Sequence, residues 1–559
     1  LIELTGGNPF RARALDNAAR IIERLETGVR ELISSGELTH IKGIGAGLVS
    51  QIEEILAYGS FELRDDILGG LPPGLLDVLS VKGLGAKKAR MLWQSLGIQS
   101  LDDLEAAALA GRIASLDGFA EKSQQTILEN IGNIRSYQGK RRMADAWADA
   151  LRLQAQLVSH PHVKAASFGG DVARLMDIVE AISIVVTCEK GLEAQICTDV
   201  GLGLAMRPVV GTDRAPGPVV LRATTTFPDG LPLELIFVQE GISGRTLFES
   251  IGPRAFVEAF DLSECPADCT AESDVFEWKG VPFVAPELRD LPLAYSRAEA
   301  LSKLPLLKYS ELRGVLHNHS TYSDGAHSLK DMSLAVRASG FEYFGICDHS
   351  QSLKIASGMS VATVLKQQQE ISRLNKEFAS DGGAPFKVFF GIESDILTDG
   401  RLDYPDDLLA QFDFIVASVH IGFKMTEIEA TDRIIKAVSN PYTTILGHPT
   451  GRLILKREGY PIDHQAVLEA CAHFGVAVEL NANPYRLDLD WRWIETATQL
   501  GVPVSINPDA HSIDQLDLMK WGALVSRKGG LTAAGCLNAL SASEFEAFLL
   551  AKRVASGIA

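Results

Sequence analysis

The chain has 559 residues, 46% hydrophobic and 22% charged, which suits several globular domains and excludes a largely disordered protein. A formal net charge of −18 argues against indiscriminate polyanion binding. The sequence contains no run of about 18 apolar residues, so it predicts no membrane span. The seven cysteines are odd in number and scattered, which favours a reducing cytoplasmic compartment.

Residues 1–142 are predicted to be helices joined by glycine turns, because apolar residues recur there at spacings of three and four. This part carries 17 Lys and Arg against 18 Asp and Glu, so nearly all of the negative excess lies beyond it. Two turns, "IKGIGAGLVSQI" (41–52) and "VKGLGAKKARML" (81–92), are near copies, and "LDGFAEKSQQTI" (116–127) is a looser third.

These turns have the pattern of a helix-hairpin-helix, in which a tight glycine turn leaves backbone N–H groups free at the start of the second helix. Such groups hold a phosphate without reading a base, which suits sequence-independent DNA binding. Ordinary helix-capping turns are the alternative interpretation. The candidate DNA-binding residues are Gly43, Gly45, Gly83, Gly85, Lys87 and Lys88.

Residues 143–292 change character. A helix is expected over 143–159, followed by "AASFGGD" and by two apolar strands at 181–186 and 231–238. Residues 243–292 are typical of a small mixed module, and a linker containing leucine and proline follows at about 293–312.

From residue 313 onward, predicted strands alternate with amphipathic helices. Seven such units in one stretch predict a parallel barrel whose site lies at the C-terminal ends of its strands. The expected strands are 314–319, 343–349, 387–394, 414–420, 443–448, 476–481 and 502–511.

Six of these seven strands finish in a residue type that binds metals. Residues i and i+2 of a strand face the same way, so His317 and His319 are expected to point together, as are Asp509 and His511. Imidazole and carboxylate donors suit Zn, Mn or Fe, and two neighbouring ions are the usual arrangement for hydrolysing a phosphate ester. The nine candidate ligands are His317, His319, Asp324, His349, Glu393, His420, His448, Asp509 and His511.

The motifs "LHNHSTYSDG", "CDHS", "GIESDILTDGRLDYPD", "GHPTGRL" and "PDAHS" resemble the polymerase-and-histidinol-phosphatase (PHP) domain fused to bacterial family X DNA polymerases. The resemblance implies a distorted (β/α)7 barrel with two or three divalent ions, Mn or Zn, and catalytic roles for Glu393, His317 and His319. Val315 stands where this family usually has an acidic residue. The implied ligand sets are His317, His319, Glu393 and Asp509 for one ion, Glu393, His420 and His448 for a second, and Asp324, His349 and His511 for a third.

The first half resembles the remainder of such a polymerase, which implies a multidomain fold with α-helical helix-hairpin-helix domains and an α+β nucleotidyltransferase-like palm and thumb. The expected order is an N-terminal helix-hairpin-helix domain (1–80), fingers (81–142), palm (143–242), thumb (243–292), linker (293–312) and PHP barrel (313–559).

The palm departs from the family pattern. Active members carry a G-S motif, then D-x-D and a third Asp that together hold Mg²⁺ or Mn²⁺, and several of these positions differ here. Gln51 stands where members with lyase activity have a lysine, so lyase activity is not expected. The corresponding palm residues are Gly169, Gly170, Glu180, Ser183 and Glu234.

The sequence therefore predicts a bacterial, cytoplasmic and nucleoid-associated DNA-repair enzyme without a membrane partner. Its predicted activity is metal-dependent 3′-5′ exonuclease action on gapped or single-stranded DNA ends, with weak or absent polymerase activity. Lys354, Lys424 or Arg452 could steer the DNA end to the barrel. A gap-filling polymerase, a small-molecule phosphatase and a non-enzymatic DNA-binding scaffold are the alternatives.

Overall fold

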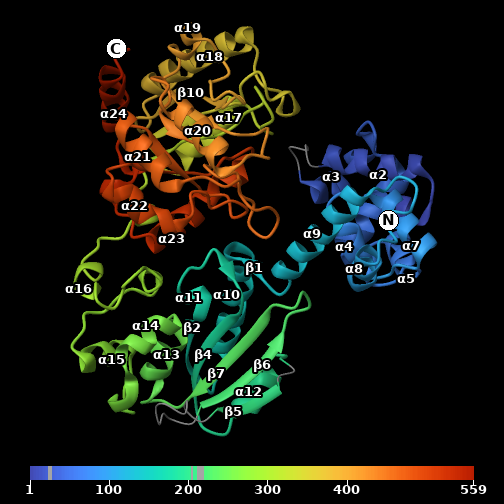
Figure 1. Ribbon diagram of the computed structural model, residues 1–559, viewed down its shortest axis with the longest axis vertical. Coiled ribbons are helices and arrows are strands. Elements are labelled where there is room, and N and C mark those ends of the chain that lie inside the picture. The colour runs from blue at the N-terminus through green and yellow to red at the C-terminus, as the bar shows by residue number, and fades with distance from the viewer. Residues whose placement is uncertain (23–27, 203–204, 210–219, 559) are drawn as a thin grey trace. The chain divides into compact units, whose positions relative to one another are not determined.

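The computed structural model describes residues 1–22, 28–202, 205–209 and 220–558. These residues form two compact units, Leu1–Gln138 and Gly139–Ala559 (Figure 1). Within the described residues, no helix combines the length and the apolar character that crossing a bilayer requires.

The first unit is all α-helical. Two cores hold it together, one around Leu32, Leu38 and Ile44 and a larger one around Leu75 and Leu92. Its helices are α1 (Ile2–Thr5), α2 (Pro9–Ile22), α3 (Val29–Ser35), α4 (Ala46–Tyr58), α5 (Glu62–Gly69), α6 (Leu75–Ser80), α7 (Ala86–Leu96), α8 (Leu101–Leu109) and α9 (Glu121–Tyr137).

The three glycine turns of this unit share one geometry. In each, a backbone N–H donates to the carbonyl three residues earlier, across a glycine with positive φ, and a helix begins shortly afterwards. Positive φ is the conformation that favours glycine. The turns are Ile44 to Ile41 across Gly43 before α4, Leu84 to Val81 across Gly83 before α7, and Phe119 to Leu116 across Gly118 before α9.

The second unit begins with a five-stranded sheet in the order β2-β4-β7-β6-β5. Strands β4 and β7 are parallel and central, which places the two expected apolar strands side by side. Helix α10 (Met143–Ser159) contributes Met143, Ala150 and Leu157 to the core of this sheet. The strands are β2 (Val163–Gly169), β4 (Ile182–Cys188), β5 (Ala205–Val209), β6 (Val220–Thr226) and β7 (Pro232–Val238).

Short elements surround this sheet. Strands β1 (Arg141–Arg142) and β3 (Ile178–Val179) pair beside it, and α11 (Gly170–Ala173) and α12 (Glu193–Asp199) lie in its connections. Three helices follow, α13 (Ser243–Ile251), α14 (Arg254–Phe260) and α15 (Glu272–Lys279), packed around buried phenylalanines. The stretch expected as a linker, 293–312, contains α16 (Ala298–Leu301) and buries Leu307, whose N–H bonds to Leu531 O.

The C-terminal domain is a parallel seven-stranded sheet, in the order β14 to β8, that curls into a nearly closed barrel. A bridge from His319 N to Ala510 O, at 2.8 Å, joins the chain after the first strand to the chain after the last. The strands are β8 (Gly314–Val315), β9 (Tyr343–Ile346), β10 (Lys387–Asp395), β11 (Phe414–Ser418), β12 (Ile445–Leu446), β13 (Ala477–Asn481) and β14 (Val504–Asn507).

Helices cover the outside of the barrel, and α24 closes its N-terminal end. Phe545 of α24 packs among Tyr343, Phe389 and Phe414, which belong to neighbouring strands. The predicted fold class is confirmed. The helices are α17 (Leu329–Ala338), α18 (Val361–Ser380), α19 (Asp406–Leu409), α20 (Glu427–Val438), α21 (His464–Phe474), α22 (Ile494–Gln499), α23 (Met519–Lys528) and α24 (Ala542–Ala555).

Candidate metal centre

All nine candidate ligands lie at the C-terminal ends of the barrel strands. Only Glu393 belongs to a strand, β10, because the other strands end earlier than expected. The alternation of side chains along a strand therefore does not orient His317 and His319. They nevertheless meet, with ring centroids 5.5 Å apart, because the loops beyond the strands turn inward.

Glu393 is the centre of the cluster. It is 1% exposed, and its Oε1 lies 3.1–3.2 Å from the Nε2 atoms of three imidazoles, while Oε2 lies 2.8 Å from His349 Nδ1. A carboxylate with donors facing both oxygens has the geometry of a bridging ligand. The three imidazoles on Oε1 are those of His317, His420 and His448.

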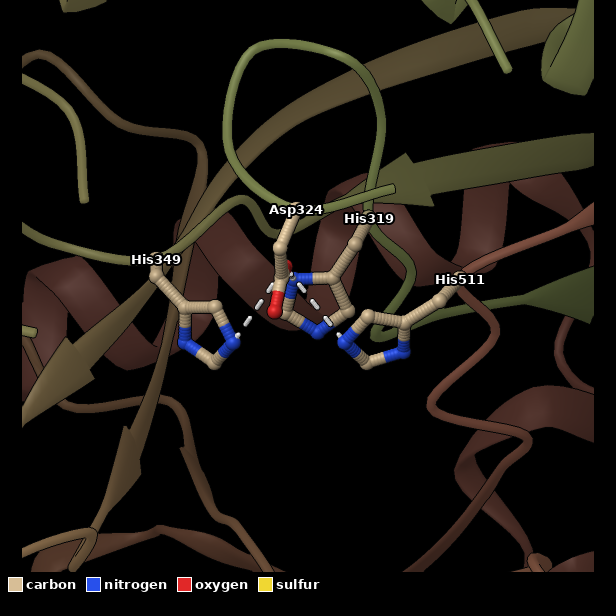
Figure 2. A group of neighbouring side chains, drawn as sticks. All are labelled: His319, Asp324, His349 and His511. Atoms are coloured by element: carbon tan, nitrogen blue, oxygen red, sulfur yellow. Dashed lines mark ion pairs between the residues drawn. The ribbon is translucent and has the colours of Figure 1, made fainter. Parts of the chain in front are cut away.

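Asp324 organises a second group of donors (Figure 2). Its Oδ1 lies 3.4 Å from His511 Nε2, 3.6 Å from His349 Nε2 and 3.9 Å from His319 Nδ1. These four residues offer ligand atoms within 4.8 Å of one another. Figure 2 shows their side chains converging from separate segments of the chain.

Asp509 connects this group to the rest of the cluster. Its Oδ1 lies 3.1 Å from His319 Nε2, 3.7 Å from His317 Nε2 and 3.8 Å from His511 Nδ1. The groups around Glu393, Asp324 and Asp509 thus share His317, His319 and His349, so the nine residues form one continuous donor cluster.

Three members of the cluster have strained backbones. His317, His448 and Asp509 have φ values of 55°, 21° and 52°, in a region that residues other than glycine rarely occupy. Such strain is concentrated at functional sites, where the surrounding structure holds it in place. The fold therefore accepts a local energetic cost in order to aim these three side chains inward.

Two carboxylates that the sequence analysis missed orient the imidazoles from behind. Glu479 is fully buried, and one of its oxygens lies 2.6 Å from His317 Nδ1. Asp395 lies 2.5 Å from His420 Nδ1. In both rings, the contact fixes Nδ1 and leaves Nε2 directed at Glu393, which is how such partners fix the tautomer and orientation of a metal ligand.

A third buried carboxylate, Asp348, shapes the loop that carries Asp324. It accepts hydrogen bonds from the backbone N–H groups of Ser320 and Ser323, from both of their hydroxyls, and from Gln367. Asp348 therefore supports the loop and does not join the donor cluster.

The electrostatics of the cluster suit cations. Burial alone would raise the pKa of Glu393, but His420, His317 and His349 outweigh it and hold that pKa well below its ordinary value. Burial opposes charge on His420 as well, yet Glu393 and Asp395 raise its pKa to about 10. Burial lowers the pKa of His319 to about 3, assisted by His511 and His349.

Several donor atoms of the cluster lack a hydrogen-bond partner in the described part of the chain, and a bound metal ion would supply the missing contact. Several are buried without a hydrogen-bond partner among the described residues, although carboxylate oxygens lie at ion-pair distance from most of them. Buried polar atoms rarely lack partners, so an ion between them would complete the set. These atoms are His317 Nε2, His319 Nδ1, His349 Nδ1 and Glu393 Oε2. The arrangement suits divalent cations.

The palm residues are only partly brought together. Ser183 and Glu234 are paired across β4 and β7, and Ser183 Oγ donates to Glu234 Oε2 at 3.3 Å. The other oxygen of Glu234 accepts from Arg222, at 2.6 Å. Glu180 lies apart in an ion pair with Lys140 at 2.8 Å. Glu234 is therefore neutralised by an arginine, and the neighbouring carboxylates Asp171 and Glu249 are paired with Arg174 and Arg245.

The glycine pair of the palm lies beside these residues. Gly169 ends β2 and Gly170 opens α11, and a Cβ at Gly169 would lie 2.0 Å from Ser250 Oγ. Gly170, Ser183, Arg222 and Glu234 line a pocket of about 230 Å³.

The candidate DNA-binding residues cluster at two hairpins of the first unit. Gly43 and Gly83 lie in the turns, and Gly45 and Gly85 are the N-cap residues of α4 and α7. Lys87 is exposed at the first turn of α7, whereas Lys88 lies over the Phe119 ring, 5.3 Å from its centroid.

One expected steering residue is not free. Arg452 is largely buried, and its guanidinium bonds to Asp490 and to Asp177 while donating to two backbone carbonyls. The expectation that it steers DNA was wrong, because its charge is already satisfied inside the protein. Lys354 and Lys424 are exposed.

Comparisons with known proteins agree with this architecture. The chain is 32% identical over 562 residues to the DNA polymerase/3′-5′ exonuclease PolX of Bacillus subtilis (strain 168), covering 98% of this chain and 96% of that protein. Residues 1–61 match a helix-hairpin-helix domain, 75–132 a SAM-like helix-hairpin-helix tandem and 316–483 the PHP domain.

Shorter stretches of the chain match further proteins. A probable phosphatase of Thermoanaerobacter sp. (strain X514) is 29% identical over 162 residues, 27% of this chain and 64% of that protein. A histidinol phosphate phosphatase of Lactococcus lactis, solved with Zn, L-histidinol and phosphate, is 19% identical with a TM-score of 0.31, covering 39% of this chain and 94% of that one.

The match to PolX extends over nearly the whole of both chains, and the helix-hairpin-helix and PHP matches fall in the order that the fold shows. It identifies a DNA-binding enzyme. The chain therefore belongs to the PolX family of bacterial DNA polymerase/3′-5′ exonucleases that carry a C-terminal PHP domain.

Proposed function

We propose that this protein is a metal-dependent 3′-5′ exonuclease that acts on DNA ends during repair through its PHP barrel, and that its polymerase activity is weak or absent. The donor cluster centred on Glu393 carries the proposal, since Glu393 faces five imidazoles and is almost fully buried. The proposed ligands are the nine residues that the sequence indicates.

We assign two or three divalent ions, Mn or Zn, to this cluster, because mixed imidazole and carboxylate donors suit both metals. Bound ions of this kind activate water and neutralise charge on a phosphodiester. Glu393 would help to hold these ions through both of its oxygens, each of which faces imidazole nitrogens. Glu479 and Asp395 would hold His317 and His420 in the tautomers that present Nε2.

Arg486 is a candidate for orienting the substrate. Its Nε lies 3.7 Å from Asp509 Oδ2, so a guanidinium stands directly beside the donor cluster. Arginine presents several N–H groups in a planar fork, which matches the geometry of a phosphate. We assign it to the scissile phosphate, where it would hold the ester against the centre.

The residues around Glu234 support the second part of the proposal, that polymerase activity is weak or absent. Nucleotidyl transfer requires clustered carboxylates to hold two Mg²⁺ or Mn²⁺ ions. Glu234 is instead bonded to Arg222, and Ser183 supplies a hydroxyl where the family pattern has an aspartate. The two other carboxylates that line this pocket, Asp171 and Glu249, are likewise paired with arginines, Arg174 and Arg245.

The helix-hairpin-helix unit would supply the sequence-independent part of DNA binding. Its glycine turns place backbone N–H groups at helix starts, where they contact phosphates and not base edges. Gapped duplexes and single-stranded ends are the proposed substrates, and the cytoplasmic nucleoid is the proposed location.

The test uses 5′-labelled gapped and single-stranded DNA with Mn²⁺, with and without nucleotides, beside the His317→Ala/His319→Ala variant. Shortening from the 3′ end that the variant lacks, without extension, is the expected result. Extension that persists in the variant would overturn the proposed loss of polymerase activity. Hydrolysis of small phosphate esters without DNA degradation would favour the small-molecule phosphatase.

A further inference from the structure

Two cysteines come together in the helical module that follows the five-stranded sheet. Cys265 and Cys269 lie in the loop between the 3-10 turn Leu262–Glu264 and helix α15, and their Sγ atoms are 3.9 Å apart. Both are free thiols and both are buried, at 7% and 5% exposure. Neither residue belongs to the donor cluster of the barrel, so the proposed function leaves this pair without a role.

Both thiols point at the same backbone atom. Cys269 Sγ donates to Pro266 O at 3.4 Å, and Cys265 Sγ donates to that oxygen at 3.7 Å. Because they share an acceptor, the two sulfurs converge instead of pointing apart. A disulfide needs sulfurs about 2.05 Å apart, so the pair must close by about 2 Å, a movement that rotation about the two Cα–Cβ bonds can supply.

The backbone around the pair is bonded to the start of α13. Gly244 N donates to Cys269 O at 3.0 Å, and Ser243 Oγ donates to Thr270 O at 2.8 Å. A Cβ at Gly244 would lie 2.1 Å from Ala271 O, so the loop and the helix are in close contact there. A shift of the loop therefore disturbs the start of α13.

Arg245 extends this contact along the helix. Its guanidinium is buried, at 2% exposure, and donates to Cys265 O at 3.4 Å and to Glu249 Oε1 at 3.1 Å. Glu249 and Ser250 of the same helix line the palm pocket of about 230 Å³. A change of the loop at Cys265 is therefore connected to the palm pocket through one buried arginine.

We propose that Cys265 and Cys269 form a redox-active dithiol, which a peroxide converts to an intramolecular disulfide. In the first step one sulfur attacks a peroxide oxygen, the O–O bond breaks, and a sulfenic acid and one water form. The second thiol then attacks that sulfur, the S–O bond breaks, and a second water leaves. The two electrons that the thiols lose reduce the peroxide, and a small-molecule dithiol reverses the reaction by exchange.

The burial of the pair makes this reaction slow at neutral pH. Burial raises the pKa of Cys265 to about 12 and also raises the pKa of Cys269. The thiolate is the nucleophile, and its fraction rises about ten-fold per pH unit below the pKa. The pair therefore responds to sustained exposure to peroxide, whereas a cysteine of low pKa responds to traces.

The test is peptide mapping of the full chain by mass spectrometry after treatment with hydrogen peroxide in EDTA. Trypsin cleaves after Arg254 and after Lys279 and at no position between them, so one peptide, 255–279, contains both cysteines and no other. Cys471 is the internal control, because burial raises its pKa to about 12 as well and it is the one cysteine of its tryptic peptide, 458–486.

Peroxide is increased until Cys471 gains oxygen. At that point peptide 255–279 is expected to be lighter by two hydrogens, resistant to iodoacetamide and restored by dithiothreitol, and to form about ten times faster at pH 9 than at pH 8. In the Cys265→Ser and Cys269→Ser variants the remaining sulfur should instead gain oxygen. A wild-type peptide that stays a dithiol, or that gains oxygen without losing two hydrogens, would overturn the proposal.

Hydrogen exchange of the reduced and oxidised proteins tests the connection to α13. Closing the sulfurs displaces the carbonyl groups that hold the start of this helix, so oxidation should speed exchange in peptides that cover 243–249. Peptides of α24, in the barrel, should exchange equally in both forms. Equal exchange in α13 of the fully oxidised protein would overturn the connection between the thiol pair and the palm pocket.

Discussion

Glu479 provides the sharpest test of how the metal centre is built. The buried carboxylate faces His317 Nδ1 at 2.6 Å and accepts from the backbone N–H of His448 at 2.7 Å and from Asn507 Nδ2 at 2.8 Å. Glu479→Gln keeps the shape but replaces one acceptor oxygen with an NH₂ group. At least one of the three contacts then sets a donor against a donor.

Two magnitudes follow from this geometry. A buried donor left without an acceptor costs about 1–3 kcal/mol of folding free energy. Loss of the group that orients a ligand lowers metal affinity about 10–100-fold, equivalent to about 1.4–2.8 kcal/mol. Because Glu479 contacts both His317 and the backbone of His448, the affinity loss should exceed what one ligand's misorientation alone would cause.

The assay is calorimetric titration of Mn²⁺ into protein stripped with EDTA, with the unfolding temperature measured in parallel. Glu469→Gln is the control, since Glu469 is exposed on α21 and accepts a hydrogen bond from Gln465. If the Glu479→Gln variant binds Mn²⁺ with the affinity of the wild type, the orienting role of Glu479 is refuted. His317 would then not be a ligand of the metal centre.

Three further predictions concern ions and protons. EDTA should lower the unfolding temperature and Mn²⁺ should restore it, because a ligand that binds only the folded state stabilises that state. The His317→Ala/His319→Ala variant should lose most of this response. Mn²⁺ binding at pH 7 should release protons, since His420 has a pKa of about 10 without ions and a ligating imidazole must be neutral. Calorimetry in buffers of different ionisation enthalpy measures the number of protons released. A binding heat that does not depend on the buffer would contradict the prediction. Burial lowers the pKa of Lys552 to about 8, below its unfolded value of about 10.4, so its charge destabilises the folded state below pH 8 and this cost disappears as pH rises to about 10.4. The unfolding free energy of the wild type should therefore rise relative to Lys552→Met across that range, and a pH-independent difference would contradict the shift.

The position of the donor cluster was predictable, but its internal geometry was not. A parallel barrel places the ends of its strands on one face, so residues at those ends must converge wherever the strands stop. The inward turn of His317, at φ 55°, depends on contacts with distant segments that no local pattern encodes. Asp395 was within reach of sequence reasoning, because it lies two residues after Glu393 on the same strand and so on the same face.

Glu479 and Arg222 illustrate contacts that only the folded chain reveals. Glu479 lies on β13, the one strand whose tip carries no candidate ligand, and its partner His317 is 162 residues away. Arg222 lies on β6 opposite Ile236, and so reaches Glu234 diagonally across the strand pair. The sequence predicted that the palm lacks its aspartates, whereas the cation that neutralises Glu234 appears only in the sheet register.

Arg452 links the barrel to the domain that precedes it. It lies four residues after His448 and bonds to Asp490 on the next loop of the barrel and, at 3.3 Å, to Asp177 of the palm. Asp177 also accepts from Trp491 Nε1 at 3.4 Å. Removing Asp177 would leave part of a largely buried guanidinium unpaired, which is costly. The domain that contains Asp177 therefore helps to hold a loop that carries a candidate ligand, through packing and charge pairing that do not depend on nucleotidyl transfer.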